Sequence, residues 1–191
     1  FFNRESLVSG LLAACQAGHW TIVTGLRRFG KSSLALEVAR RLQGAYAYVD
    51  LAGFHHEVSS SGDPARVADE MLRYVCEQLH ASAMHVHRAP PGLPDVPSEG
   101  TSLDPGTLVA WMRALVAACR KQNGDRPVNL LVILDEVEQA IGVGPARIAH
   151  AVDVVSVFVG RLRAALGDTL LGKGGDRIGV LFCSALHPLL W

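Results

Sequence analysis

Two short stretches of this sequence hold residues whose types and spacing suit phosphate and metal chemistry. Residues 25–32 read GLRRFGKS, so that two glycines precede a lysine and a serine. Glycines let a backbone bend until its N–H groups surround a phosphate chain, and a helix that starts at the lysine adds unpaired donors and the positive end of its dipole. In that arrangement Lys31 would reach the β- and γ-phosphates of a nucleotide, and Ser32 would bind Mg²⁺.

The second stretch, residues 131–136, reads LVILDE and ends an apolar run with two acids. We expect Asp135 to hold the Mg²⁺ shell and Glu136 to polarise an attacking water molecule, because phosphoryl transfer to water needs both a metal and an aligned nucleophile. Taken alone, two acids at this position would more often cap a strand or solvate a turn. Their combination with residues 25–32 favours the metal site.

Other polar residues end predicted strands and are weaker candidates. Ser184 follows the last apolar run; it is predicted to sense the γ-phosphate or the water, and a hydroxyl that merely closes a strand is the alternative. Asp50 ends another run, where a local cap is favoured over support of the metal shell. Three arginines are candidates for donation to a neighbouring site, with surface solvation as the favoured alternative: Arg147, Arg161 and Arg163.

Apolar periodicity and stop signals predict the elements that must position these residues. Short β-branched or continuously apolar runs predict strands at 20–24, 46–50, 129–134 and 178–183. Apolar spacing of three and four predicts helices at 5–17, from Lys31 to a cap at Gly44, after Asp63-Pro64, after Asp104-Pro105, and at 146–166. Strands that alternate with helices predict an α/β sandwich with a mainly parallel sheet. The proline- and glycine-rich residues 89–103 predict a mobile surface loop.

This context separates the stretch at 25–32 from a second, similar one. Residues 167–174, GDTLLGKG, also contain G-x-x-x-x-G-K, but a predicted helix precedes them and a predicted strand follows. Gly174 also stands where the hydroxyl is needed. We therefore predict a plain loop at 167–174 and a phosphate site only at 25–32.

Composition limits the function classes further. The 191 residues carry 18 basic and 18 acidic side chains, so no overall field attracts nucleic acid or an anionic membrane, although local patches are not excluded. The apolar run at 151–160 is interrupted by Asp153 and is shorter than the ~20 residues that span a bilayer. Four widely spaced cysteines indicate reduced thiols of a cytoplasmic protein. Because the chain begins at Phe1 and ends at Trp191 after a strand-like run, we expect one domain of a larger protein.

Three segments together resemble a known family. Phe2-Asn3-Arg4-Glu5 resembles an F-x-x-R-E box, GLRRFGKSSL resembles the Walker A form G-x-R-R-x-G-K-[ST]-S-L, and LVILDE resembles Walker B. Over nearly its whole length, 1–191, the chain is similar to P-loop ATPases of the AAA+/STAND group, the signal-transduction ATPases with numerous domains.

The resemblance implies a three-layer P-loop sandwich with strand order 5-1-4-3-2, of which the fifth strand would lie outside this chain. It implies ATP or ADP with Mg²⁺, a catalytic Glu136, and Arg4 at the adenine end, where a solvent-exposed helix start is the alternative. The paired Arg27 and Arg28 would contact phosphate, an acidic neighbour or a partner domain, or be solvated. The nucleotide contacts would come from Gly25, Leu26, Arg27, Arg28, Phe29, Gly30, Lys31, Ser32 and Ser33.

The resulting prediction is an ATP-hydrolysing switch module of a signalling or defence protein, with flanking domains and nucleotide-dependent self-association. One alternative is an ATPase of the origin-recognition or helicase-loading kind that acts on DNA, which the balanced charge disfavours. Another alternative is a scaffold that binds a nucleotide without hydrolysing it. A P-loop kinase is the least favoured, because Glu directly after the strand-end Asp suits water activation. No N-K-x-D motif for reading guanine occurs, which favours ATP by elimination.

Overall fold

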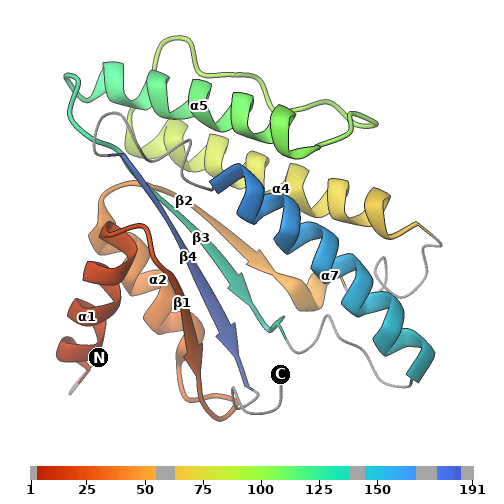
Figure 1. Cartoon of the computed structure of the whole chain (residues 1–191). Coiled ribbons are helices and arrows are strands. Elements are labelled where there is room, and N and C mark those ends of the chain that lie inside the picture. The colour runs from red at the N-terminus through yellow and green to blue at the C-terminus, as the bar shows by residue number, and fades with distance from the viewer. Residues whose placement is uncertain (1–3, 55–62, 138–144, 167–175, 186–191) are drawn as a thin grey trace.

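The computed structural model describes residues 4–54, 63–137, 145–166 and 176–185, with the backbone alone for 145–151. Four strands form one sheet in the order β1-β4-β3-β2, and every neighbouring pair is parallel (Figure 1). The strands are β1 (Trp20–Thr24), β2 (Ala45–Asp50), β3 (Asn129–Asp135) and β4 (Arg177–Ser184). The helices are α1 (Glu5–Gln16), α2 (Lys31–Leu42), the short 3₁₀ helix η1 (Leu51–Phe54), α4 (Pro64–Val86), α5 (Pro105–Gln122) and α7 (Pro145–Leu166).

Helices cover both faces of the sheet, and the alternation of strand side chains divides the core in two. On one face α1 and α2 pack against Leu131, Ile133, Leu181 and Cys183. On the other face α4, α5 and α7 gather over the intervening strand residues, which include Leu130, Val132 and Val180 (Figure 1). This arrangement confirms the predicted α/β sandwich with a parallel sheet, and it explains why β3 is continuously apolar.

The register of the sheet brings the carboxyl ends of the strands to one edge. Thr24 of β1 lies opposite Ser184 of β4, and Asp50 of β2 lies opposite Asp135 of β3. The loop after β1 and the turn after β3 therefore leave the sheet at the same edge, although more than a hundred residues separate them. In an open parallel sheet this edge is where ligands usually bind.

Two long helices begin as their Asp-Pro pairs predict. Asp63 accepts a hydrogen bond from the N–H of Ala65 at 2.9 Å, and Asp104 accepts one from the N–H of Thr107 at 2.9 Å. Each proline occupies the first turn, where its missing N–H leaves no intrahelical bond unmade. Both caps are therefore local devices, which is why the sequence alone could locate them.

The end of α2 differs from its prediction. The left-handed residue that ends the helix is Gln43, with φ 55°, and not Gly44. Gly44 has another role, because a Cβ there would lie 1.9 Å from the carbonyl oxygen of Asn129 on β3. Glycine is needed for the close approach of two backbones where β2 enters the sheet, so the prediction of Gly44 as a helix cap was wrong.

Residues 89–103 form no helix or strand, as predicted, but they lie against the core. Leu103 is fully buried, and Leu93 and Val96 pack on the cluster beneath α5. The indole N–H of Trp111 on α5 donates to the carbonyl oxygen of Asp95 at 2.8 Å. The predicted surface loop is therefore confirmed, with apolar contacts and this hydrogen bond attaching it to α5, and its mobility stays a prediction.

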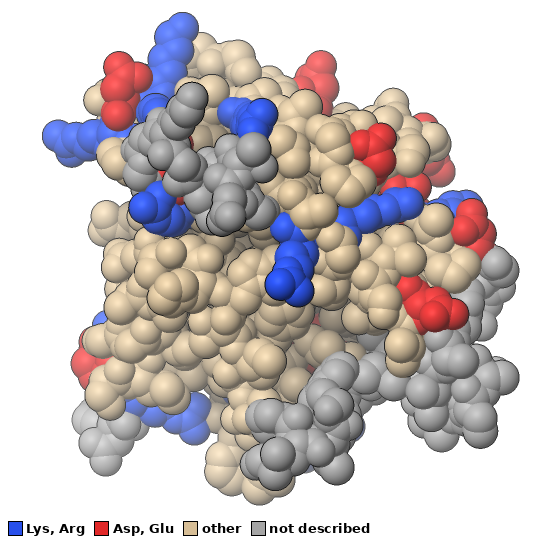
Figure 2. Space-filling view, viewed as in Figure 1, with Lys and Arg blue, Asp and Glu red and all other residues tan. Residues whose placement is uncertain are grey.

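The surface carries charges of both signs. On the face seen in Figure 2, lysines and arginines are interspersed with acids, and large areas between them bear no charged side chain. This agrees with the even count of 18 basic and 18 acidic residues. Among the described residues, no helix combines the length and the apolar composition that crossing a bilayer requires.

Candidate functional site

Polar side chains that are removed from solvent mark the carboxyl edge of the sheet. Within the described part of the chain, the buried polar or charged residues are Lys31, 8 % exposed, Asp135, 1 % exposed, and Ser184, 2 % exposed. All three follow or end a strand at this edge. Burying a polar group costs free energy unless it is hydrogen-bonded, so such a group usually serves a structural network or a ligand. Sequence reasoning had selected all three.

The loop between β1 and α2 folds around the lysine. The Lys31 ammonium donates to the carbonyl oxygens of Gly25, at 3.1 Å, and Leu26, at 3.2 Å. Gly30 precedes the helix with φ 78°, a left-handed conformation suited to glycine, and supplies no side-chain cap. The N–H groups of the first turn of α2 therefore lack a capping side chain, and with the helix dipole they favour an anion.

Arg4 lies against this loop. Its guanidinium donates to the carbonyl oxygen of Phe29 at 2.6 Å, and a Cβ on Gly30 would lie 3.2 Å from the same nitrogen. Arg4 also immediately precedes α1, and its contact with Phe29 is exposed, so the alternative of a solvent-exposed helix start still holds. Whether the guanidinium also meets a base stays a prediction.

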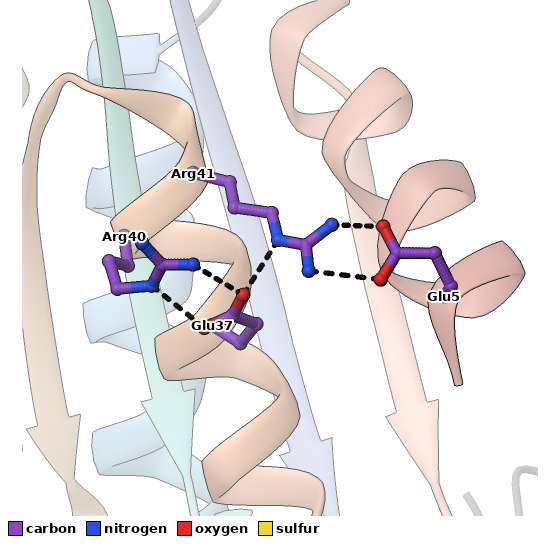
Figure 3. A network of polar contacts seen from close by, with 4 residues as sticks. All are labelled: Glu5, Glu37, Arg40 and Arg41. Carbon is purple, nitrogen blue, oxygen red and sulfur yellow. Dashed lines mark hydrogen bonds and ion pairs between the residues drawn. The ribbon is translucent and has the colours of Figure 1, made fainter. Parts of the chain in front are cut away.

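A network of charges joins α1 to α2 (Figure 3). Arg41 on α2 binds both carboxylate oxygens of Glu5 on α1, one of them at 3.0 Å, and also donates to Glu37 at 2.6 Å. Arg40 binds Glu37 at 2.8 and 2.9 Å. The hydrogen bonds from Arg40 and Arg41 lower the pKa of Glu37 to about 2.

Asp135 is held by hydrogen bonds to both of its oxygens. Its Oδ1 accepts from the backbone N–H of Glu136 at 2.9 Å, and its Oδ2 accepts from the hydroxyl of Tyr48 on β2 at 2.5 Å. Burial raises the pKa of Tyr48 well above its usual range, the hydrogen bond to Asp135 raises it further, and the nearby Ser32 acts in the opposite direction. Tyr48 thus binds Asp135 and lies near Ser32, the two residues predicted to bind Mg²⁺.

Sequence reasoning missed Tyr48. Its only signal is a hydroxyl placed two residues before the end of a predicted strand, on the face opposite to that of its immediate neighbours. To select it, one must know that β2 lies beside β3 and in which register. That pairing is a property of the tertiary structure.

The donor chemistry at this point fits Mg²⁺. Ser32 and Asp135 offer a hydroxyl and a carboxylate, and Mg²⁺ prefers oxygen ligands and is usually bound by one or two protein groups together with phosphate oxygens and water. Asp135 is also fixed by its two hydrogen bonds, and fixed ligands suit the strict geometry of this ion.

Glu136 contacts the loop between β1 and α2. Its Oε2 lies 3.6 Å from the guanidinium of Arg27, whose side chain is 63 % exposed. Glu136 also has φ 52°, a left-handed conformation that is uncommon for a residue with a side chain and that concentrates at functional sites. Of the meanings considered for Arg27, contact with an acidic neighbour is therefore the one observed, and the neighbour is the predicted water-activating acid.

The remaining loop residues face solvent. Arg28 is exposed and has φ 64°, and Ser33 is exposed on α2. Leu26 and Phe29 are exposed although they are apolar, at 69 % and 59 %. The loop backbone is thus the part that surrounds Lys31, while these side chains point away from the core.

Ser184 lies at the end of β4, opposite Thr24, as predicted. It contributes to the lining of an apolar cavity of about 360 Å³ between the sheet and α7, together with Phe182 and Val159. Its proposed contact with a phosphate or a water molecule stays a prediction. The burial of its hydroxyl is what keeps it a candidate.

Two further candidates have structural roles. Asp50 is exposed and accepts from the N–H of Ala52 at 3.0 Å, which confirms the local cap. Arg161 on α7 pairs with Asp69 on α4 at 2.5 Å, and the same carboxylate oxygen accepts from the N–H of Leu103 at 2.7 Å. Surface solvation was therefore the wrong prediction for Arg161.

Arg163 is exposed, as the solvated alternative requires. Several predicted features lie outside the described residues, namely Phe2 and Asn3, the side chain of Arg147, and the loop at 167–174.

Comparison with known proteins adds no relative. No protein-family model matches the chain, and no curated protein is detectably similar to it in sequence.

Proposed function

We propose that this chain binds ATP or ADP with Mg²⁺ in the loop at 25–32 and hydrolyses ATP. The observation that carries the proposal is the buried Lys31 ammonium, wrapped by its own loop at the same sheet edge as the buried Asp135. The strand order β1-β4-β3-β2 supports it, because this is the order of P-loop ATPases with 5-1-4-3-2 sheets when the fifth strand is left out.

Each residue has a role that its position allows. Lys31 exchanges two loop carbonyls for β- and γ-phosphate oxygens, and the uncapped first turn of α2 donates its N–H groups to the same phosphates. Ser32 and Asp135 hold the Mg²⁺, which when bound neutralises developing charge on the phosphates. Glu136 orients and polarises the attacking water once its carboxylate leaves Arg27.

The biological setting of the proposal follows the family resemblance. The module is a switch within a larger signalling or defence protein, in which the γ-phosphate distinguishes two states through Lys31, Mg²⁺ and Ser184. The proposal includes flanking domains in the parent protein and self-association that depends on the bound nucleotide. Adenine is favoured over guanine, with Arg4 at the base end of the loop.

A second candidate is a scaffold that binds nucleotide without hydrolysing it. One observation favours it: in this structure Glu136 lies in an ion pair with Arg27, a state in which its carboxylate is engaged by the loop. An ATPase that acts on DNA has no comparable support, since the face seen in Figure 2 mixes both signs of charge and the sequence has as many acidic as basic residues.

Calorimetric titration of Mg²⁺-ATP, Mg²⁺-ADP and Mg²⁺-GTP tests the binding proposal. We expect the wild type to bind the adenine nucleotides and Lys31→Ala to lose them, and Lys121→Ala, an exposed lysine of α5, serves as the control. A folded wild type that binds none of the three refutes the proposal.

Turnover separates the two candidates. Glu136→Gln keeps the size of the side chain and removes its charge, so we expect nucleotide binding to persist while phosphate release falls at least ~100-fold, the usual effect of losing general-base catalysis. A wild type that binds ATP but releases phosphate no faster than Glu136→Gln would favour the scaffold.

A further inference from the structure

Tyr48 occupies a position at the site that no motif assigns. It lies on β2, opposite Ile133 of β3, and its ring packs on the face of the sheet that α1 and α2 cover. From there its hydroxyl donates to Asp135, the last residue of β3, at 2.5 Å. Ser32, at the start of α2, is near enough to lower the pKa of that hydroxyl. One phenol therefore binds one of the residues that are expected to meet the metal ion and lies near the other.

The contact matters because Asp135 is almost entirely removed from solvent. A carboxylate that is 1 % exposed must obtain from the protein the hydrogen bonds that water would otherwise give. Its two donors are the N–H of Glu136 at Oδ1 and the hydroxyl of Tyr48 at Oδ2. The N–H group is fixed by the backbone. The Tyr48 hydroxyl is the donor that belongs to a side chain, and it sets the rotation of the Asp135 carboxylate. Each oxygen keeps a further lone pair for an outside ligand.

We infer that Tyr48 is a positioning residue for the metal site, and that it couples Mg²⁺ to nucleotide binding by fixing the Asp135 carboxylate beside Ser32. This inference rests on the proposed function and deepens it. Groups that orient a metal ligand in this way typically change metal affinity by about 10- to 100-fold when they are removed. The effect passes through Asp135, so it belongs to the Mg²⁺-dependent part of nucleotide binding and not to the contacts of Lys31 with phosphate.

A purely structural tyrosine predicts a different result. Tyr46 lies two residues earlier on the same strand and packs in the same cluster as Tyr48. If only ring packing mattered, removing either hydroxyl would alter nucleotide binding to the same small extent, with or without metal. Tyr46→Phe is therefore the matched control for Tyr48→Phe, because both changes delete one oxygen and keep the ring.

The test is calorimetric titration of ADP into the whole chain over a range of Mg²⁺ concentrations and in excess EDTA. For Tyr48→Phe we expect the Kd for ADP without metal to stay within about twofold of the wild-type value. The Mg²⁺ concentration that gives half of the metal-dependent gain in affinity should rise about 10- to 100-fold, the range typical of lost groups that orient a metal ligand. Tyr46→Phe should match the wild type in both the metal-free Kd and this Mg²⁺ concentration. A wild-type Mg²⁺ dependence in Tyr48→Phe overturns the inference, and so does an equal loss with and without metal.

A second measurement keeps the inference testable if Tyr48→Phe also lowers fold stability. In an Asp135→Asn background, adding Tyr48→Phe should cause no further loss of Mg²⁺ dependence, because the phenol acts through that carboxylate. Additive losses in the double variant contradict this coupling. Failure of the wild type to bind ADP under every condition refutes the proposed function itself and the inference with it, whereas normal wild-type binding with an unaltered Tyr48→Phe refutes the inference alone.

Discussion

Replacing Lys31 by methionine separates the ligand role of this residue from a structural role. Methionine keeps a long apolar stem and removes the ammonium. In the structure that ammonium meets two loop carbonyls, and no salt bridge joins it to a carboxylate of the described residues. A lysine that is 8 % exposed is thus compensated by carbonyl dipoles alone in the free protein.

The expected magnitudes differ for folding and for binding. In the free protein, Lys31→Met removes a costly buried charge and leaves two carbonyls at the surface of the loop to be solvated, so we expect the free energy of unfolding to change by at most about 1 kcal/mol. In the complex the same change removes a hydrogen bond between charged groups, worth about 1.5–3 kcal/mol, which corresponds to a roughly 10- to 100-fold weaker Kd.

Thermal unfolding with and without Mg²⁺-ADP measures both effects in one assay. At a ligand concentration 100 times the wild-type Kd, binding adds about 2.7 kcal/mol to stability. For a domain of this size that raises the Tm by about 5–11 °C, since each kcal/mol shifts it by about 2–4 °C. In Lys31→Met, with a Kd weakened 100-fold, we expect a rise of only about 1 °C. The exposed-lysine control Lys121→Met should behave as the wild type does.

One outcome refutes the reasoning directly. If Lys31→Met lowers the Tm of the free protein by more than about 5 °C and the ligand-induced rise persists, the lysine is a clamp for its own loop and not a phosphate ligand.

Three further predictions concern the framework of the site. Gly44→Ala should lower the free energy of unfolding by about 1–3 kcal/mol, because its Cβ meets the carbonyl oxygen of Asn129, whereas Gly160→Ala, in open space on α7, should raise it by about 0.5–1 kcal/mol; urea unfolding of both variants checks this. The pKa of Glu37 is lowered to about 2 from an ordinary 4.5, so its ionised carboxylate stabilises the fold above pH 4.5, and this contribution is lost as the pH falls to 2. The loss of stability over that range should therefore be smaller in Glu37→Gln, as acid titrations followed by circular dichroism would show. Burial raises the pKa of Cys76 to about 12, so a thiol reagent at pH 8 should label it only at the rate of unfolding, and fast labelling of the native protein would contradict the buried position.

The features that sequence reasoning predicted well are those whose causes are local. The caps at Asp63 and Asp104 act on N–H groups two and three residues away, so the Asp-Pro pairs were sufficient to locate both helix starts. The loop at 25–32 is likewise contiguous, and its strand and helix flank it directly. Lys31 could therefore be selected as a candidate site residue before any tertiary contact was known, whereas its burial is seen only in the structure.

The features that were missed or misassigned depend on pairing between distant segments. Gly44 reads as a helix cap until β2 is placed within reach of Asn129, and Arg161 reads as a surface arginine until α7 is placed against Asp69. Tyr48 is 87 residues from the aspartate that it contacts. Periodicity predicts which face a side chain occupies but not which neighbouring element it meets, and each of these three roles is set by the neighbour.

In the free protein the loop at 25–32 contacts both charged groups of the site, and this has a consequence for the proposed mechanism. The Lys31 ammonium donates to the carbonyls of Gly25 and Leu26, while Arg27, next in the chain, lies 3.6 Å from the Glu136 carboxylate. In the proposed complex, phosphates that bind Lys31 would take the place of those two carbonyls, and the Leu26 carbonyl belongs to the peptide unit that leads into Arg27. Binding at the lysine and release of the glutamate thus share one backbone segment, so nucleotide binding itself would prepare the acid that activates water.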